Sequence, residues 1–91
     1  MESPFAVRLS NKAEKQFQEL ESGIKERVRR LFSDLEEIPV PFKIYDLKKV
    51  KGKADEYRIR LSRFRVIYQI SYNEKTVRIA KIERRSDNTY D

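Results

Sequence analysis

The stretch YRIRL at Tyr57–Leu61, followed by FRVIYQI at Phe64–Ile70, decides the fold of this chain. Apolar side chains occupy odd positions in the first segment and even positions in the second. Because the side chains of a strand alternate between two faces, this change of phase at Ser62-Arg63 requires a turn or a bulge. The pattern therefore predicts two antiparallel strands joined by a tight turn, each with one face in the core.

Before these strands, the sequence predicts a short strand and two helices. Large apolar residues occupy every second position from Phe5 to Leu9, which indicates a strand with one buried face. Asn11 fits the N-cap of a helix, with Glu14 as the returning half of a capping box, and Ser22-Gly23 is expected to break that helix. A second helix should run to the stop at Pro39-Val40-Pro41, because apolar residues recur at helical spacing: Ile24, Val28, Leu31, Leu35 and Ile38.

The remaining segments complete an α+β domain. Residues 42–56 fit neither period and read as a connection that allows a short strand near its start. After a turn at 73–75, a last strand passes through Val77, Ile79 and Ile82, and the slip of phase between the last two allows a bulge. We expect one domain over residues 1–91, with a two-helix hairpin packed on one face of an antiparallel sheet and a polar tail at 86–91.

Positive charge is concentrated in the C-terminal half of the chain. The net charge is +6, and residues 1–42 carry seven basic and eight acidic side chains, whereas residues 43–85 carry fourteen basic and five acidic ones. Such asymmetry favours contact with a polyanion, and nucleic acid is the leading candidate. The alternative is a basic surface that only keeps the protein soluble.

Two residue types are absent from the chain, and their absence limits the kinds of active site that it can contain. The chain has no cysteine and no histidine. Disulfides, thiolate nucleophiles, histidine-dependent triads and most transition-metal sites are therefore excluded. No stretch reaches the roughly 18 apolar residues of a membrane span, so we expect a soluble cytoplasmic protein that makes no contact with a membrane.

Arginines gather where the two central strands are predicted. Four of them alternate away from the core and are expected to share one face of the sheet: Arg58, Arg60, Arg63 and Arg65. Like charges opposite one another repel, so the arrangement favours an anionic partner, and guanidinium forks match phosphate. The alternative is that these arginines are solvated and pair with nearby acids such as Asp55 and Glu56.

The paired segments at Tyr57–Leu61 and Phe64–Ile70 resemble the aromatic-Arg-Val-Ile-Tyr signature of the RelE/ParE toxin superfamily. The resemblance spans nearly the whole chain, from the first strand to Arg84 and Tyr90. It implies a RelE-like microbial ribonuclease fold and a toxin of a type II toxin–antitoxin system that is neutralised by a cognate antitoxin. Such a toxin enters the ribosomal A site, cleaves the mRNA there and arrests translation.

The resemblance also implies an active site. It implies a metal-independent endoribonuclease without cofactor, in which a 2′-hydroxyl attacks the adjacent phosphate. The positions that match the catalytic residues of RNA-cutting relatives are Arg58, Arg60, Arg65, Arg84 and Tyr90. On this hypothesis Arg65 and Arg84 hold the scissile phosphate, Arg58 and Arg60 orient the backbone near the 2′-hydroxyl, and Tyr90 stacks on or orients a base.

The general base stays open at this point. The best-studied type of RNA-cutting relative carries lysines where this chain has Arg58 and Arg60, and an arginine effectively cannot lose its proton. The remaining candidates for the base are Lys48, Lys51, Glu83 and Tyr90.

Further basic residues are candidates for RNA binding. They are Lys48, Lys49, Lys51, Lys53, Arg63 and Arg85. The lysines surround Gly52, and the alternative is a solvated loop. Two other functions also remain: a ParE-like toxin that poisons DNA gyrase, and a non-catalytic module that binds nucleic acid.

Overall fold

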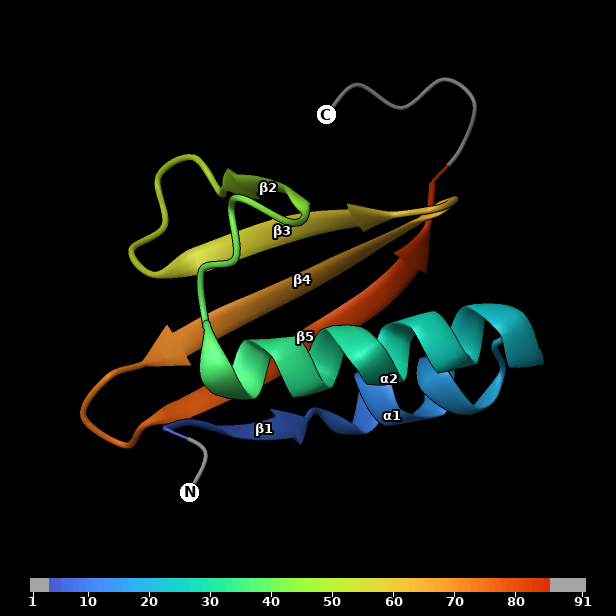
Figure 1. The fold of residues 1–91 in the computed structure, drawn as a ribbon, viewed down its shortest axis with the longest axis horizontal. Coiled ribbons are helices and arrows are strands. Elements are labelled where there is room, and N and C mark those ends of the chain that lie inside the picture. The colour runs from blue at the N-terminus through green and yellow to red at the C-terminus, as the bar shows by residue number, and fades with distance from the viewer. Residues whose placement is uncertain (1–3, 86–91) are drawn as a thin grey trace.

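Two helices and five strands follow one another along residues 4–85, the part of the chain that this computed structural model describes (Figure 1). Their bounds are β1 Ala6–Leu9, α1 Asn11–Gln18, α2 Ser22–Glu37, β2 Asp46–Lys49, β3 Glu56–Leu61, β4 Phe64–Ser71 and β5 Thr76–Arg84. The strands form one sheet in the order β1-β5-β4-β3-β2. Neither helix within residues 4–85 is long and apolar enough to cross a membrane.

The sheet is mixed. Strands β2, β3, β4 and β5 pair antiparallel to their neighbours, whereas β1 pairs parallel to β5. The predicted α+β domain with a helical hairpin on one face of the sheet is confirmed. The parallel edge differs from the wholly antiparallel sheet that the sequence indicated, because β5 enters the sheet between β1 and β4. The short strand that the sequence allowed in the connection is β2, which begins four residues after the start of residues 42–56.

The first helix begins one residue earlier than the sequence indicated. Ser10 is the N-cap of α1, and its hydroxyl accepts a hydrogen bond from the backbone N–H of Ala13 at 3.0 Å. The prediction that Asn11 caps the helix was therefore wrong. An N-terminal cap of this kind stabilises a helix by about 1 kcal/mol.

The break between the helices also differs from the prediction. Helix α1 ends at Gln18, and Ser22 and Gly23 are the first two residues of α2. The two residues expected to break the first helix instead begin the second, so the break falls at residues 19–21. The predicted stop at Pro39 is confirmed, since α2 ends at Glu37.

The core lies between α2 and the central strands. Val28, Leu31 and Leu35 of α2 are fully buried, as are Ile59 and Val66 of the sheet. Burial of a side chain of this size stabilises the fold by about 1.5–3 kcal/mol. The phase predicted for the two central strands therefore holds, and it leaves the alternate side chains on the other face.

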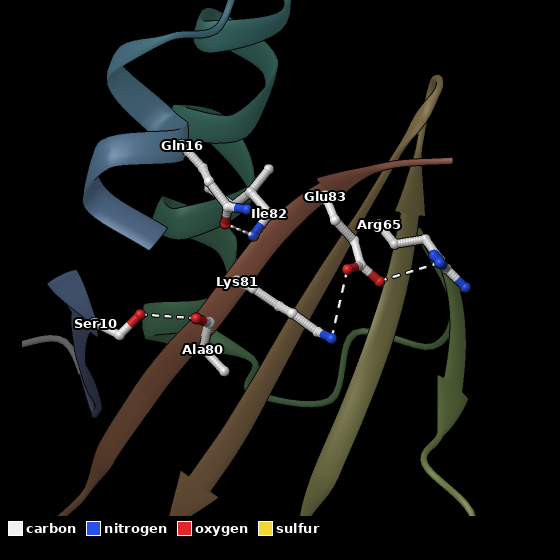
Figure 2. Close-up of polar contacts among 7 residues, drawn as sticks. All are labelled: Ser10, Gln16, Arg65, Ala80, Lys81, Ile82 and Glu83. Carbon is white, nitrogen blue, oxygen red and sulfur yellow. Dashed lines mark hydrogen bonds and ion pairs between the residues drawn. The ribbon is translucent and has the colours of Figure 1, made fainter. Parts of the chain in front are cut away.

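A β-bulge sits in β5. Ile67 pairs with Lys81 and Tyr68 pairs with Ile79, so Ala80 is the extra residue. The N-cap of α1 and a residue within α1 bind the backbone at the bulge: the Ser10 hydroxyl donates to the carbonyl of Ala80 at 2.7 Å, and Gln16 Oε1 accepts from the N–H of Ile82 at 2.7 Å (Figure 2). The bulge resets the alternation of β5, which places Ile82 in the core and its neighbours Lys81 and Glu83 on the opposite face.

Candidate active site on the arginine face

The sheet face turned away from the helices carries most of the predicted site; we call it the arginine face. Strand pairing arranges its side chains in rows across the sheet. The first row, nearest the β3–β4 turn, contains Asp46 of β2, Arg60 of β3, Arg65 of β4 and Glu83 of β5. The expectation that Arg60 and Arg65 share a face is confirmed, and the row adds one carboxylate at each end.

Ion pairs hold the two arginines of the first row. The Nη2 atom of Arg65 lies 3.0 Å from Oε1 of Glu83, and Nζ of Lys81 lies 3.4 Å from the other carboxylate oxygen of Glu83 (Figure 2). Nη1 of Arg60 lies 3.6 Å from Oδ2 of Asp46. The side chains of Arg65 and Glu83 are 22% and 30% exposed, so solvent reaches both. The acids found beside the arginines are therefore Asp46 and Glu83, where the sequence had indicated Asp55 and Glu56.

This charge order prepares the first row for an anion. Arg60 and Arg65 are directly opposite each other, and two like charges at that spacing repel. Each carboxylate lies on the outer side of one arginine and offsets part of that repulsion without separating the pair. A phosphate placed over the pair can accept from two guanidinium forks, which is the geometry that guanidinium groups favour.

Arg58 lies in the second row. Its cross-strand neighbours are Lys48 of β2 and Ile67 of β4, and Ile67 is in turn opposite Lys81. Arg58 is on the expected face, but only 8% of the residue is exposed. An incoming RNA can touch only a small part of this arginine.

Two predicted site arginines do not join the arginine face. Arg63 lies in the two-residue turn between β3 and β4, because Leu61 pairs directly with Phe64. Arg84 is exposed and pairs with Phe64, and by alternation it lies on the side of Ile82. Both arginines line a cleft of about 640 Å³ on the helix side of the sheet, which also includes Leu20 and Ile24. The expectation that Arg63 shares a face with Arg65 was therefore wrong, and Arg84 is not brought beside Arg65.

The predicted RNA-binding residues are spread along one edge of the sheet and the β3–β4 turn. Lys48 is opposite Arg58, and Lys49 is opposite Tyr57. Lys51 and Lys53 lie in the exposed loop around Gly52, where a backbone φ of +78° favours glycine. Arg85 lies against the turn: its N–H donates to the carbonyl of Arg63 at 2.7 Å, and its Nη1 donates to that of Ser62 at 3.4 Å. Tyr90 lies outside the described residues.

Sequence reasoning missed several residues of the arginine face. Asp46 and Lys81 were not singled out, because the bulge and the strand register that place them are tertiary features. Arg8 of β1 and Arg78 of β5 are opposite each other on the same face. The period-two alternation in residues 5–9 and in the last strand could have identified both. Within residues 4–85, no three acidic side chains gather closely enough to hold a metal ion.

Comparisons with known proteins agree with this architecture. A sequence profile described as the ParE toxin of the type II toxin–antitoxin system, parDE, matches residues 7–89. A protein of Methanocaldococcus jannaschii named as a RelE1 toxin is 30% identical over 81 residues, which cover 89% of this chain and 90% of that protein. The crystal structure of the archaeal RelE–RelB complex from Pyrococcus horikoshii contains a chain that matches with a TM-score of 0.83 and 30% identity, covering 92% of this chain and 98% of that one. The isolated RelE toxin of E. coli matches in fold, with a TM-score of 0.79 and 21% identity, covering 92% of this chain and 87% of that one.

Proposed function

The chain belongs to the ParE toxin family of type II toxin–antitoxin systems, and from this premise we propose that it is a ribosome-dependent endoribonuclease that cleaves mRNA in the A site and arrests translation. Two relatives at 30% identity over most of the chain carry the RelE name, which favours the RNA-cutting branch. The single observation that carries the proposal is the first row of the arginine face. There Arg60 and Arg65 stand opposite each other between two carboxylates.

The proposed reaction needs charge and position. The 2′-oxygen attacks the adjacent phosphorus, its proton passes to a base, and the P–O5′ bond breaks as the leaving 5′-oxygen gains a proton. Arg60 and Arg65 are assigned to the negative charge that builds on the phosphate oxygens during attack. One pre-aimed donor of this kind contributes about 3 kcal/mol by analogy with oxyanion holes. The chemistry draws on side-chain charge and requires no metal or cofactor.

Glu83 is the first candidate for the base among the four that the sequence left open. Its carboxylate lies 3.0 Å from Arg65, so a 2′-hydroxyl beside the bound phosphate would be within its reach. Lys48 is one row away and Lys51 is in the loop around Gly52. Lys81, 3.4 Å from Glu83, is placed to return a proton to the leaving oxygen. Tyr90 keeps its proposed role as the residue that stacks on or orients a base.

Arg58 and Arg84 are given auxiliary roles. Arg58 lies in the second row and is assigned to the backbone near the 2′-hydroxyl. Arg84 is proposed to act from the end of β5 rather than as the partner of Arg65. This assignment departs from the two-arginine clamp of Arg65 and Arg84, because the register places these residues on opposite sides of the sheet.

A cognate antitoxin is the proposed protein partner. The relative from Pyrococcus horikoshii was crystallised as a RelE–RelB complex. We propose that an antitoxin segment covers the basic half of this chain and blocks RNA. Its affinity should fall as salt rises if the arginine face is part of the interface, because exposed ionic contacts are screened.

A second candidate function is the poisoning of DNA gyrase, and the observation that favours it is the name of the matching profile. A purified translation system combined with a supercoiling assay separates the candidates. The proposed ribonuclease stops protein synthesis and shortens the mRNA. A gyrase poison instead blocks supercoiling and leaves the message whole, and a non-catalytic nucleic-acid-binding module shows salt-sensitive binding without either effect.

A further inference from the structure

The cations of the arginine face follow a diagonal across the sheet. In the first row they are Arg60 on β3 and Arg65 on β4. The second row has Lys48 on β2, Arg58 on β3 and Lys81 on β5, with Ile67 between the last two. In the third row the cations lie at the β1 edge of the sheet, where Arg78 on β5 is opposite Arg8 on β1.

The acids of the same face lie off this diagonal. Asp46 and Glu83 are at the two ends of the first row. The only acid of the third row within residues 4–85 is Glu56 on β3, at the other side of Gln69 from Arg78. Positive charge therefore continues from the candidate active site to the corner of the sheet formed by β1 and β5.

The corner pair has no counter-charge among the described residues. Arg8 and Arg78 are both exposed, and within residues 4–85 neither makes an ion pair or a side-chain hydrogen bond. Neighbouring strands lie about 4.8 Å apart, so the two guanidinium groups start from adjacent backbone positions. Two like charges held this close destabilise the sheet unless an anion joins them.

The surroundings of Arg78 suit a sugar-phosphate chain. A hollow of about 560 Å³ lies beside it, and Gln69 lines that hollow with an exposed amide. Ser71 and Thr76 also line it, but the Ser71 hydroxyl accepts from the N–H of Glu74 and the Thr76 hydroxyl donates to the carbonyl of Glu74. Asp55 and Glu74 also line it. Arg78 is the one cation among its lining residues, and Arg8, opposite Arg78 on β1, lies outside the hollow. Hydroxyl and amide groups next to a guanidinium are typical contacts of ribose and phosphate oxygens.

We infer that Arg8 and Arg78 form a second phosphate-binding site, which holds the RNA backbone away from the cleaved bond. This inference rests on the proposed ribonuclease function. Arg78 and Glu83 lie opposite Gln69 and Arg65 of β4, which are four residues apart, or about 13 Å at about 3.3 Å per residue. The site therefore cannot touch the scissile phosphate, and its contribution is to binding rather than to chemistry.

The test compares the double variant Arg8→Ala/Arg78→Ala with Lys12→Ala. Lys12 is an exposed cation on α1, in the helix layer, so its removal controls for the loss of one charge, and the single variants Arg8→Ala and Arg78→Ala are compared with it as well. Dissociation constants are measured for a single-stranded oligoribonucleotide and for programmed ribosomes between about 50 and 200 mM salt. We expect about tenfold weaker RNA binding and a salt slope lower by about one to two in the double variant, since each lost phosphate contact reduces the slope by about one. Single-turnover cleavage on saturating ribosomes should match the wild type.

Three outcomes decide the inference. Affinity and salt slope equal to those of Lys12→Ala would overturn it, and so would intact RNA binding with weakened antitoxin binding, which would assign the pair to an acidic peptide. Weakened RNA binding by the double variant supports it. Ribosomes that carry a message truncated just beyond the A-site codon then identify the source of the phosphate. The difference in affinity between the double variant and the wild type disappears on these ribosomes if the phosphate belongs to mRNA, and it persists if the phosphate belongs to ribosomal RNA. Failure of the proposed function is a separate result, because the wild type itself would then leave programmed mRNA uncut.

Discussion

Arg60 and Arg65 lie directly opposite each other on β3 and β4, and each has a carboxylate on its outer side, from Asp46 at 3.6 Å and Glu83 at 3.0 Å. Across four strands the row therefore has a carboxylate at each end and the two arginines in the middle. Two positive charges are thus concentrated at the centre of the sheet between the flanking acids, and their side chains are 32% and 22% exposed. A polyanion that displaces or shares these contacts would find a preformed site.

Arg65→Ala should abolish toxicity while leaving the fold intact. The substitution removes half of the central arginine pair, and the loss of the partly exposed ion pair with Glu83 costs about 1 kcal/mol. Growth after induction measures toxicity, and circular dichroism with thermal unfolding measures the fold. Arg84→Ala should be milder, because Arg84 lies on the helix side of the sheet. Full toxicity of Arg65→Ala would remove the first row from the mechanism.

Glu83→Gln should separate binding from chemistry. Removing a negative charge beside the bound phosphate should tighten RNA binding by up to about fivefold, the order of an exposed charge pair. Loss of the proton acceptor should lower the single-turnover rate by about 100-fold. Asp46→Asn is the matched variant, because it also neutralises an acid of the first row but leaves Glu83 in place. Equal rates for Glu83→Gln and the wild type would exclude Glu83 as the base.

The pH dependence of cleavage should lack the bell of a histidine enzyme. The chain has no histidine, so no protein group with an ordinary pKa near about 6.5 is available. The single-turnover rate should rise with pH or stay flat between about pH 6 and 8. A bell near pH 6.5 that survives in each of five variants would assign the titrating group to the ribosome: Lys48→Ala, Lys51→Ala, Lys81→Ala, Glu83→Gln and Tyr90→Phe.

Tyr45→Phe should reduce the loss of stability at alkaline pH. Burial, followed by the hydrogen bond that its hydroxyl donates to Asp34 at 2.6 Å, raises the pKa of Tyr45 to about 12. In the unfolded chain a tyrosine titrates near about 10. The contribution of Tyr45 is therefore complete below about pH 10 and is lost as pH rises from about 10 to about 12. Denaturant unfolding across this range measures it, and identical pH slopes for variant and wild type would contradict the account.

The sequence predicts the strands of the site well, because alternation is a local property. Apolar residues at Ile59 and Val66 specify the buried face, so Arg60 and Arg65 had to lie on the other one. The phase reversal at Ser62-Arg63 likewise located the turn. The same reasoning misplaced Arg63, since a two-residue turn removes Arg63 itself from the alternation of either strand.

The partners of the arginines depend on register, which the sequence does not specify. Asp46 lies in a segment without clear periodicity, and only the pairing of β2 with β3 brings it opposite Arg60. Glu83 and Lys81 follow the bulge at Ala80, where the phase of β5 is reset. Ser10 and Gln16 bind the backbone at that bulge, so the helix determines which side chains of β5 reach the arginine face.

Mapping the mRNA ends produced on programmed ribosomes tests the central claim most directly. Ribosomes stalled with a defined codon in the A site are incubated with wild-type toxin, Arg65→Ala or Lys12→Ala, and primer extension locates each cut. The account predicts a single cut within the A-site codon for the wild type and for Lys12→Ala, at least about 100-fold slower with Arg65→Ala. An intact message with the wild-type toxin, or equal cutting by Arg65→Ala, would contradict it.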